Sequence, residues 1–218
     1  MAIVTIVLGH SGSGKSFSLK NLDPELTGVI GVINKPLPFR GGHKLKTVVT
    51  DSPEWIVGNL PHFRAPIVVI DDFQYIMGNE FMRGVTKELT GNAAFMRYNI
   101  IGQNAWNILN TAVNHTAPNQ RIYILCHSEE VEGKTKMKTI GKMLDEKIVP
   151  EGMVTIVLQT VIRNNENFFT TKNDGTTTVK TPHEMFSSDL IPNDLNAVDD
   201  AICEYYGIPK NPNQPISN

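Results

Sequence analysis

Residues 2–16, AIVTIVLGHSGSGKS, join an apolar run to a glycine-rich turn that ends in lysine and serine. Residues 9–16 (GHSGSGKS) match the pattern G-x-x-x-x-G-K-[ST] in full. In this pattern the glycines let the backbone wrap closely around phosphates, and successive N–H groups hold the negative charge. A buried strand before the loop and a short helix over residues 16–21 supply the context that the pattern requires. We therefore predict a phosphate-binding loop, and a flexible Gly/Ser turn is the alternative.

The positions of this loop carry distinct predicted roles. Lys15 is expected to reach the β- and γ-phosphates of ATP and to serve catalysis, and Ser16 is expected to ligate Mg²⁺ through its hydroxyl. ATP and Mg²⁺ are thus the expected cofactors. The predicted nucleotide-binding residues are Gly9, His10, Ser11, Gly12, Ser13, Gly14, Lys15 and Ser16.

A second apolar run ends in two carboxylates. Residues 67–72 (IVVIDD) predict a buried strand that places Asp71 and Asp72 at the carboxyl edge of the sheet, beside the phosphate-binding loop. Asp71 is expected to hold Mg²⁺ through water. Asp72 is a candidate for orienting the attacking water, and Gln74 is another candidate for that role. An ordinary strand end is the alternative for both carboxylates.

Residues 121–130 (RIYILCHSEE) predict a further buried strand with a polar end. If this strand lies between the other two, His127 or Ser128 would face the γ-phosphate as a sensor, and we name His127 as a catalytic candidate. A histidine satisfied at a strand end is the alternative. The six histidines show no zinc spacing, and no cysteine pair accompanies them.

Apolar runs alternate with helical segments along the chain. Strands are predicted at residues 2–8, 29–33, 67–70, 121–126 and 153–161, with a hairpin partner at 168–170. Helices are predicted from Ser52-Pro53, over residues 75–115 with a break at Gly91, over 138–149, and from an Asn193 cap. This alternation implies an α/β sheet covered by helices on both faces. We expect one domain over residues 1–206 and a disordered tail over 207–218.

The composition is that of an ordinary globular protein, with 40% hydrophobic and 19% charged residues. The net charge of −2 gives no global signal for nucleic acid, so any DNA contact must come from a local patch. Cys126 and Cys203 predict no disulfide framework, which suits a reducing compartment. The apolar start is too short to span a bilayer. We expect a cytoplasmic location and no membrane contact.

Residues 132–142 (EGKTKMKTIGK) carry four lysines after an acidic segment. Residues 128–138 are predicted to form a polar loop, and alternating lysines in a flexible loop can track a phosphate backbone. Solvated hairpin lysines are the alternative, since no aromatic residue is interleaved. The predicted DNA-binding residues are Lys134, Lys136, Lys138 and Lys142.

Five segments together resemble a group of bacteriophage ATP-binding proteins. They are the phosphate-binding loop, VVIDDFQYIMGNEFMR (68–83), CHSEE (126–130), KTIGKMLDEKI (138–148) and TKNDGTTTVKTP (171–182). The group comprises the small RecA-like single-strand annealing proteins of the Sak type, often labelled phage AAA-family ATPases. The resemblance spans roughly residues 3–206. It implies a RecA-like P-loop NTPase core with a C-terminal β-hairpin extension. The implied activity is a weak or DNA-stimulated Mg²⁺-dependent ATPase that binds single-stranded DNA and promotes annealing in phage recombination.

The resemblance also assigns positions. Gly9, Gly14, Lys15, Ser16 and Asp71 match the nucleotide-site positions one for one. The fourth strand's polar end, at His127, falls where RecA-like proteins place a γ-phosphate sensor, usually glutamine. Residues 128–138 fall where they carry a DNA-binding loop. The chain has no separate glutamate after the third strand, which leaves the catalytic carboxylate open.

The resemblance further implies a homo-oligomer. RecA-like ATP sites usually lie between subunits, and a basic residue from the neighbour completes the charge on the γ-phosphate. Lys172 and Lys180 are the candidates for this donated residue, and solvated hairpin lysines are the alternative. A phage single-strand binding protein is a further expected partner, with the host cytoplasm as the location. The alternative functions are a phage helicase-loading or motor ATPase and a non-hydrolysing, ATP-switched DNA-binding module.

Overall fold

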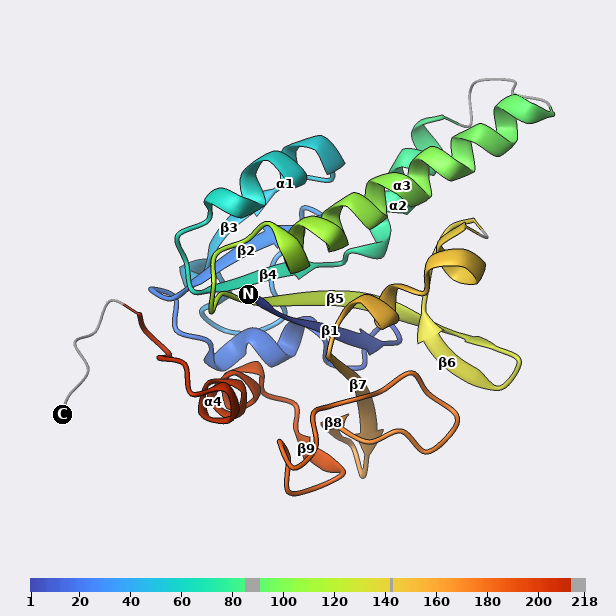
Figure 1. Ribbon diagram of the computed structural model, residues 1–218. Coiled ribbons are helices and arrows are strands. Elements are labelled where there is room, and N and C mark those ends of the chain that lie inside the picture. Colours follow the sequence, from blue (N-terminus) through green and yellow to red (C-terminus); the bar gives the residue numbers. More distant parts are fainter. Residues whose placement is uncertain (85–90, 142, 213–218) are drawn as a thin grey trace.

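A nine-stranded sheet forms the centre of the computed structural model, which describes residues 1–84, 91–141 and 143–212 (Figure 1). The strands follow the order β3-β2-β4-β5-β1-β7-β8-β9, and β6 pairs with β5 alone. Their bounds are β1 Ile3–Gly9, β2 Thr27–Gly31, β3 Lys46–Val49, β4 Ile67–Asp71, β5 Arg121–Val131, β6 Lys134–Met137, β7 Ile156–Arg163, β8 Glu166–Thr170 and β9 Leu190–Pro192.

Six neighbouring strands, from β3 to β7 in the sheet order, run parallel, whereas β8 and β9 add an antiparallel extension. Strand β5 lies between β1 and β4, and its Arg121 is in register with both Ile3 and Ile67. The same register aligns Gly9 with His127 at the carboxyl edge. The predicted fold class is therefore confirmed: an α/β fold with a mainly parallel sheet and a C-terminal antiparallel hairpin extension.

Helices cover both faces of the sheet, as predicted (Figure 1). The helices are α1 Pro53–Asn59, α2 Gln74–Arg83, α3 Asn92–Asn114 and α4 Leu195–Tyr206, with the shorter η1 Ser16–Asn21, η2 Gly42–Lys44, η3 Leu60–His62, η4 Met143–Ile148 and η5 Pro150–Met153. The first three α-helices lie on one face, and α4 and η1 lie on the other. No helix in the described ranges is long and apolar enough to cross a membrane.

Successive residues of the central strands point to opposite faces, so each strand supplies two separate cores. On β4, Val68 and Ile70 pack with the core under α1 to α3, whereas Ile67 and Val69 pack with the core that includes α4. Both faces are therefore buried. This double burial explains why the strands read as uninterrupted apolar runs in the sequence.

Two predicted helix starts have different outcomes. Ser52 caps α1 as expected, because its Oγ accepts from the backbone N–H of Trp55 at 3.2 Å. The cap of α4 is Asp194, whose carboxylate accepts from the N–H of Asn196 at 2.9 Å. The expectation that Asn193 caps this helix was wrong. The side chain of Asn193 turns instead to the loop that follows β1.

The predicted polar loop over residues 128–138 was also wrong. Strand β5 continues to Val131, and the chain returns as β6 in antiparallel register. The turn is possible because Glu132 and Gly133 adopt φ values of 51° and 74°, the pair of left-handed residues that a tight hairpin turn uses. The helix predicted over 138–149 shrinks to the single π-helical segment η4, which follows Gly141 at φ 86°.

The segment after α4 begins at Gly207, whose φ of 62° ends the helix as predicted. The chain then stays attached to the domain through Lys210. Its Nζ donates to Asn196 at 2.9 Å and pairs with Asp200, and its carbonyl accepts from Arg121 at 2.8 Å. Residues 213–218 of the predicted tail lie outside the described ranges.

Candidate functional site

The loop of residues 9–16 requires glycine at several positions. Gly12 and Gly14 adopt φ values of 77° and 97°, which glycine reaches without steric cost. A Cβ on Gly9 would lie 1.9 Å from Oγ1 of Thr160. A Cβ on Gly14 would lie 2.3 Å from Nδ2 of Asn193. The pattern of glycines thus reflects both the turn itself and the close packing of the loop on the C-terminal part of the chain.

Two distant side chains hold this loop, and sequence reasoning missed both functions. Thr160 on β7 donates to the carbonyl of Leu8 at 3.2 Å, and its Oγ1 lies 2.5 Å from Oγ of Ser13. Asn193 donates to the carbonyl of Gly14 at 2.9 Å. These contacts join segments that are more than a hundred residues apart, so no local pattern could have indicated them. They fix the loop before any ligand binds.

Lys15 lies inside the loop and is only 6% exposed. Its Nζ donates to the carbonyls of Gly9 at 2.8 Å and His10 at 2.9 Å. Burial lowers the pKa of Lys15, and the nearby carboxylate of Asp72 opposes that shift. The ammonium group is therefore held where the sequence predicts the β- and γ-phosphates, with backbone carbonyls as its present partners.

Asp71 and Ser16 meet as the sequence predicts. The Oγ of Ser16 donates to Oδ1 of Asp71 at 3.0 Å, and the carboxylate is buried at the end of β4. Burial first, and the charge of Asp72 second, raise the pKa of Asp71 to about 6. A cation beside this carboxylate would relieve that penalty, because it favours the ionised form.

A hydroxyl next to a carboxylate suits Mg²⁺, which keeps several waters and takes phosphate oxygens as further ligands. No group of three or more His, Cys, Asp or Glu side chains that could enclose a metal occurs in the described part of the chain. Ser16 and Asp71 therefore fit the predicted magnesium site of a nucleotide complex. They do not form a metal cage made by protein alone.

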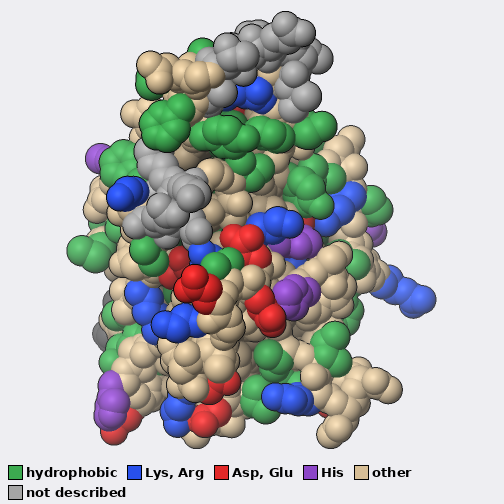
Figure 2. All heavy atoms as spheres, turned by 90° about the vertical axis from the view of Figure 1, so that its right-hand side faces the viewer, with side chains coloured by type: hydrophobic (Ala, Val, Ile, Leu, Met, Phe, Trp, Pro, Cys, Tyr) green, Lys and Arg blue, Asp and Glu red, His purple; other side chains and the backbone are tan. Residues whose placement is uncertain are grey.

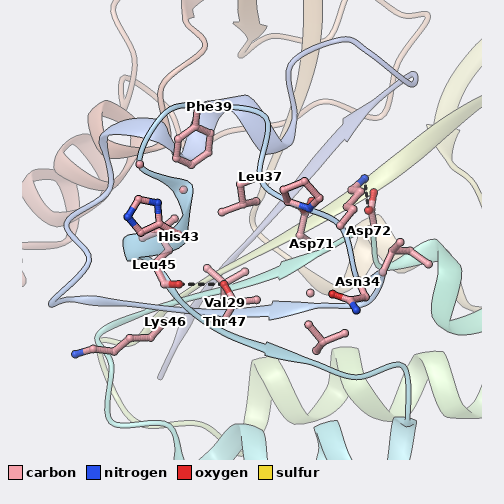
Figure 3. Close-up of a pocket in the computed structure, with 17 residues that line it drawn as sticks. Val29, Asn34, Leu37, Phe39, His43, Leu45, Lys46, Thr47, Asp71 and Asp72 are labelled. Carbon is pink, nitrogen blue, oxygen red and sulfur yellow. Dashed lines mark hydrogen bonds and ion pairs between the residues drawn. The ribbon is translucent and has the colours of Figure 1, made fainter.

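Asp72 occupies an unusual backbone position beside Asp71. Its φ of 65° lies in the left-handed region, and its side chain is 3% exposed. The ammonium of Lys35 forms an ion pair with Oδ2, which Figure 3 shows as a dashed line at Asp72. Nε2 of His127 lies 3.9 Å from Oδ1. Lys35 is not predictable from the sequence, because it sits in a Pro/Gly-rich loop with no motif of its own.

His127 faces the site from the point where β5 ends its parallel pairing with β1. Burial first, and then the positive charge of Lys15, lower its pKa to about 4, so the imidazole is neutral at pH 7. Its backbone N–H donates to Oε1 of Gln74 at 3.1 Å, and the ring of Tyr75 packs edge-on against the imidazole. Nε2 of Gln74 is buried without a hydrogen-bond partner. Ser128, the other sensor candidate, is buried with an unpartnered Oγ.

The lysine hairpin continues from this edge. Lys134 and Lys136 lie on β6, opposite Val131 and Glu129, and the N–H of Lys138 donates to the carbonyl of His127 at 2.8 Å. Lys134 and Lys138 are exposed, whereas Lys136 is half-buried. Lys142, the fourth predicted DNA-binding residue, lies outside the described ranges. The hairpin projects beyond the main sheet next to the helical segment η4 (Figure 1).

The two candidates for a donated lysine lie elsewhere on the chain. Lys172 forms an exposed ion pair with Asp189 at 2.6 Å. Lys180 pairs through its backbone with Val157, near the start of β7, whereas Thr160, farther along that strand, contacts the phosphate-binding loop. Their donation to a neighbouring subunit remains a prediction, since it concerns a second copy.

A pocket of about 610 Å³ extends from Asp71 and Asp72 along β2 and β3 (Figure 3). Its other end is lined by Phe39 and His43 from the loop between these strands. Figure 2 views the side of the molecule toward which β1 and β5 run, and acidic, basic and histidine side chains gather in the middle of this face. The candidate site is thus open to solvent at the carboxyl edge of the sheet.

Comparisons with known proteins add little to this geometry. No protein-family model and no curated protein sequence matches the chain. One solved structure that aligns with it comes from work titled "Structural and biochemical analysis of a prototypical ATPase from the type III secretion system of pathogenic bacteria", with a TM-score of 0.40 and 12% identity. The alignment covers 73% of this chain and 52% of the ATPase chain, so the chain spans about half the length of that protein.

Proposed function

We propose that this protein is a Mg²⁺-dependent ATPase whose nucleotide state controls its binding to single-stranded DNA, and that it promotes strand annealing in phage recombination. The observation that carries the proposal is the hydrogen bond of 3.0 Å between Ser16 and Asp71. It joins the phosphate-binding loop to the carboxylate of a different strand. With β5 inserted between those strands, His127 lies at the same edge.

Each side chain has a chemical task in this proposal. Lys15 and the N–H groups of the loop bind the β- and γ-phosphates, and Ser16 and Asp71 hold the cation. Mg²⁺ would neutralise part of the phosphate charge. Asp72 orients the attacking water and takes its proton. Gln74 suits that role less well, because its Oε1 already accepts from the N–H of His127.

A neutral His127 can sense the γ-phosphate by hydrogen bonding without adding a charge to the site. The lysine hairpin starts directly after this residue on the same strand. A shift of His127 toward a phosphate would therefore move the base of the hairpin that carries Lys134 and Lys136. This continuity supports coupling between nucleotide binding and DNA binding. The DNA would bind to the lysine side chains of the hairpin through its phosphate charge.

The proposal is tested by measuring ATP turnover with and without single-stranded DNA, alongside annealing of complementary strands. Turnover stimulated by single strands, together with faster annealing, supports it. Duplex unwinding or translocation would favour a helicase-loading or motor ATPase. DNA binding that depends on ATP without turnover would favour the non-hydrolysing switch. No ATP binding at all would contradict all three.

The proposal includes a homo-oligomer in the host cytoplasm, with a phage single-strand binding protein as a further partner. If Lys180 or Lys172 acts on a neighbour, specific ATPase activity should rise with protein concentration. A mixture of Lys15→Ala and Lys180→Ala proteins should then recover partial activity. Full activity of both Lys180→Ala and Lys172→Ala in a demonstrated monomer would exclude a shared site.

A further inference from the structure

Lys35 is the second ammonium group of the candidate site. It follows β2 in the loop that borders the pocket of Figure 3, and its Nζ pairs with the buried carboxylate of Asp72. The two partners differ sharply in exposure: the side chain of Lys35 is 45% exposed, whereas that of Asp72 is 3% exposed. The cation can therefore leave the pair, and the carboxylate cannot.

The backbone of this loop is anchored at the site. The N–H of Val32 donates to the carbonyl of Asp71 at 3.1 Å, and the N–H of Lys35 donates to the carbonyl of Ile33 at 2.9 Å. The base of the Lys35 side chain is thus held beside β4, while its long flexible stem borders the open pocket. The half-exposed ammonium can exchange partners only if another donor, such as water, replaces it at the buried carboxylate of Asp72.

The charge of Lys35 already acts on the rest of the site. The pKa of Lys15 is lowered by burial and also by Lys35, and the pKa of His127 is lowered by burial, by Lys15 and by Lys35. For Asp71, burial and Asp72 raise the pKa while Lys35 and Lys15 oppose the rise. Lys35 therefore influences groups on three different segments: Lys15 in the glycine-rich loop, Asp71 on β4 and His127 on β5.

We propose that Lys35 is a catalytic residue that acts within its own subunit: on ATP binding its ammonium moves from Asp72 to the γ-phosphate. This inference rests on the proposed ATPase function. The move has two consequences. It adds a positive charge where phosphoryl transfer concentrates negative charge, and it frees the carboxylate of Asp72 to accept a hydrogen bond from water.

Water then attacks the γ-phosphate in a single displacement. The oxygen of the water forms a bond to the γ-phosphorus, and the bond between that phosphorus and the β–γ bridging oxygen breaks. ADP departs with the electron pair of the broken bond. The proton of the water passes to Asp72 and then to solvent, after which Lys35 returns to the carboxylate.

The test compares the affinities of ATP and ADP, because only ATP carries the γ-phosphate. In Lys35→Gln we expect Mg-ATP binding, measured by calorimetry, to weaken about tenfold or more, while Mg-ADP binding stays within about twofold. Turnover should fall about a hundredfold. Lys35→Arg should restore most of the preference for ATP, since it keeps the charge. Lys46→Gln is the matched control, because Lys46 lines the same pocket and pairs with exposed Glu25 rather than with a carboxylate of the site.

Several results would overturn the assignment. If Lys35→Gln weakens ATP and ADP equally, or changes neither, Lys35 merely neutralises Asp72. If Lys35→Gln regains turnover when mixed with Lys15→Ala, the lysine acts between subunits, because a site that needs both groups from one chain cannot be complemented. If the wild-type protein binds and hydrolyses ATP while Lys35→Gln gives one of these results, the proposed function stands and the assignment of Lys35 is wrong. Wild-type protein that binds neither nucleotide contradicts both proposals.

Discussion

Strand β5 carries two charged clusters that differ in how completely their groups are hydrogen-bonded, one at its first residue and one where it leaves the parallel sheet. At its first residue, Arg121 is 1% exposed and donates to both carboxylate oxygens of Asp199, at 2.9 and 3.0 Å. The hydroxyl of Tyr123 adds a third bond to that carboxylate at 2.7 Å. Where β5 leaves the parallel sheet, His127 lies 3.9 Å from Asp72, beyond hydrogen-bond distance, and Nε2 of the neighbouring Gln74 is buried without a partner.

The difference separates a structural cluster from a functional one. A buried charge pair whose hydrogen bonds are complete is fixed in one geometry, and it resists the loss of either partner. An incompletely bonded cluster at an open edge retains donors, acceptors and a mobile cation for a ligand. The strand therefore anchors α4 at its first residue, its closed end, and presents the candidate site where it leaves the parallel sheet, called here its open end.

The largest expected effect is on stability, at the closed end. Replacing Asp199 by alanine leaves the Arg121 guanidinium buried without its carboxylate, which should lower the free energy of unfolding by about 3–5 kcal/mol. Urea denaturation measures this loss. Asp200→Ala is the control on the same helix, because that carboxylate pairs with Lys210 at the surface. A loss below about 1 kcal/mol for Asp199→Ala would contradict the assignment of this pair as a structural anchor.

At the open end the largest effect should come from Lys15. Lys15→Ala removes the ammonium held inside the loop, so ATP affinity or turnover should fall at least about a hundredfold. The fold should survive, because Thr160 and Asn193 hold the loop independently of this side chain. Lys20→Ala, an exposed lysine on η1, is the control. Hydrolysis by Lys15→Ala at the wild-type rate would show that the phosphate-binding assignment is wrong.

Asp71, at the open end, should lower the free energy of unfolding at neutral pH. Its pKa of about 6 lies above that of the unfolded chain, so the folded protein binds this proton more tightly. This tighter binding of the proton stabilises the folded protein fully below about pH 4, and the stabilisation is lost as pH rises to about 6. Without nucleotide, Asp71→Asn should be more stable than wild type at pH 7.5, by roughly 2 kcal/mol.

The pH dependence gives the check. Between pH 5 and pH 7.5 the stability advantage of Asp71→Asn, from urea denaturation, should grow by roughly 1 kcal/mol. The same substitution should weaken binding of Mg-ATP. A variant that is less stable than wild type at both pH values would mean that the Ser16–Asp71 bond matters more to the fold than the desolvation of the carboxylate.

The sequence was sufficient where the determinants are local. The run before Gly9 and the run that ends at Asp71 had to be buried strands, and the glycine spacing between Gly9 and Ser16 defined the loop. The insertion of β5 between β1 and β4 was only a condition in the sequence analysis, because strand order depends on long-range pairing. The structure meets that condition, and His127 consequently faces Asp72.

The predictions that were wrong or missing share one cause, which is that they depend on long-range tertiary contacts. Asn193 has the chemistry of a helix cap, yet its amide donates to Gly14 and Asp194 takes over the cap. The polar segment after His127 has few apolar residues, yet it pairs as a hairpin in which Thr135 and Met137 are buried. Lys35 has no local signature at all, since its importance arises from the carboxylate that follows the neighbouring strand β4. Local propensity could not reveal contacts that depend on the packed fold.

The smallest effect should come from the lysine hairpin, and it extends the comparison to DNA. Neutralising Lys134, Lys136 and Lys138 to glutamine removes three positive charges close to His127, so single-strand affinity should fall and its dependence on salt should flatten. Each lost phosphate contact lowers the slope of log affinity against log salt by about 0.7 for a single strand. ATP affinity should persist, because these side chains lie outside residues 9–16.

Neutralising Lys20, Lys44 and Lys46 changes the charge equally, away from the hairpin, and should leave the slope unchanged. Affinity measured by fluorescence anisotropy at several salt concentrations distinguishes the cases. Equal slopes for the two triple variants would place the DNA path on another surface and would break the proposed link between the open end of β5 and DNA.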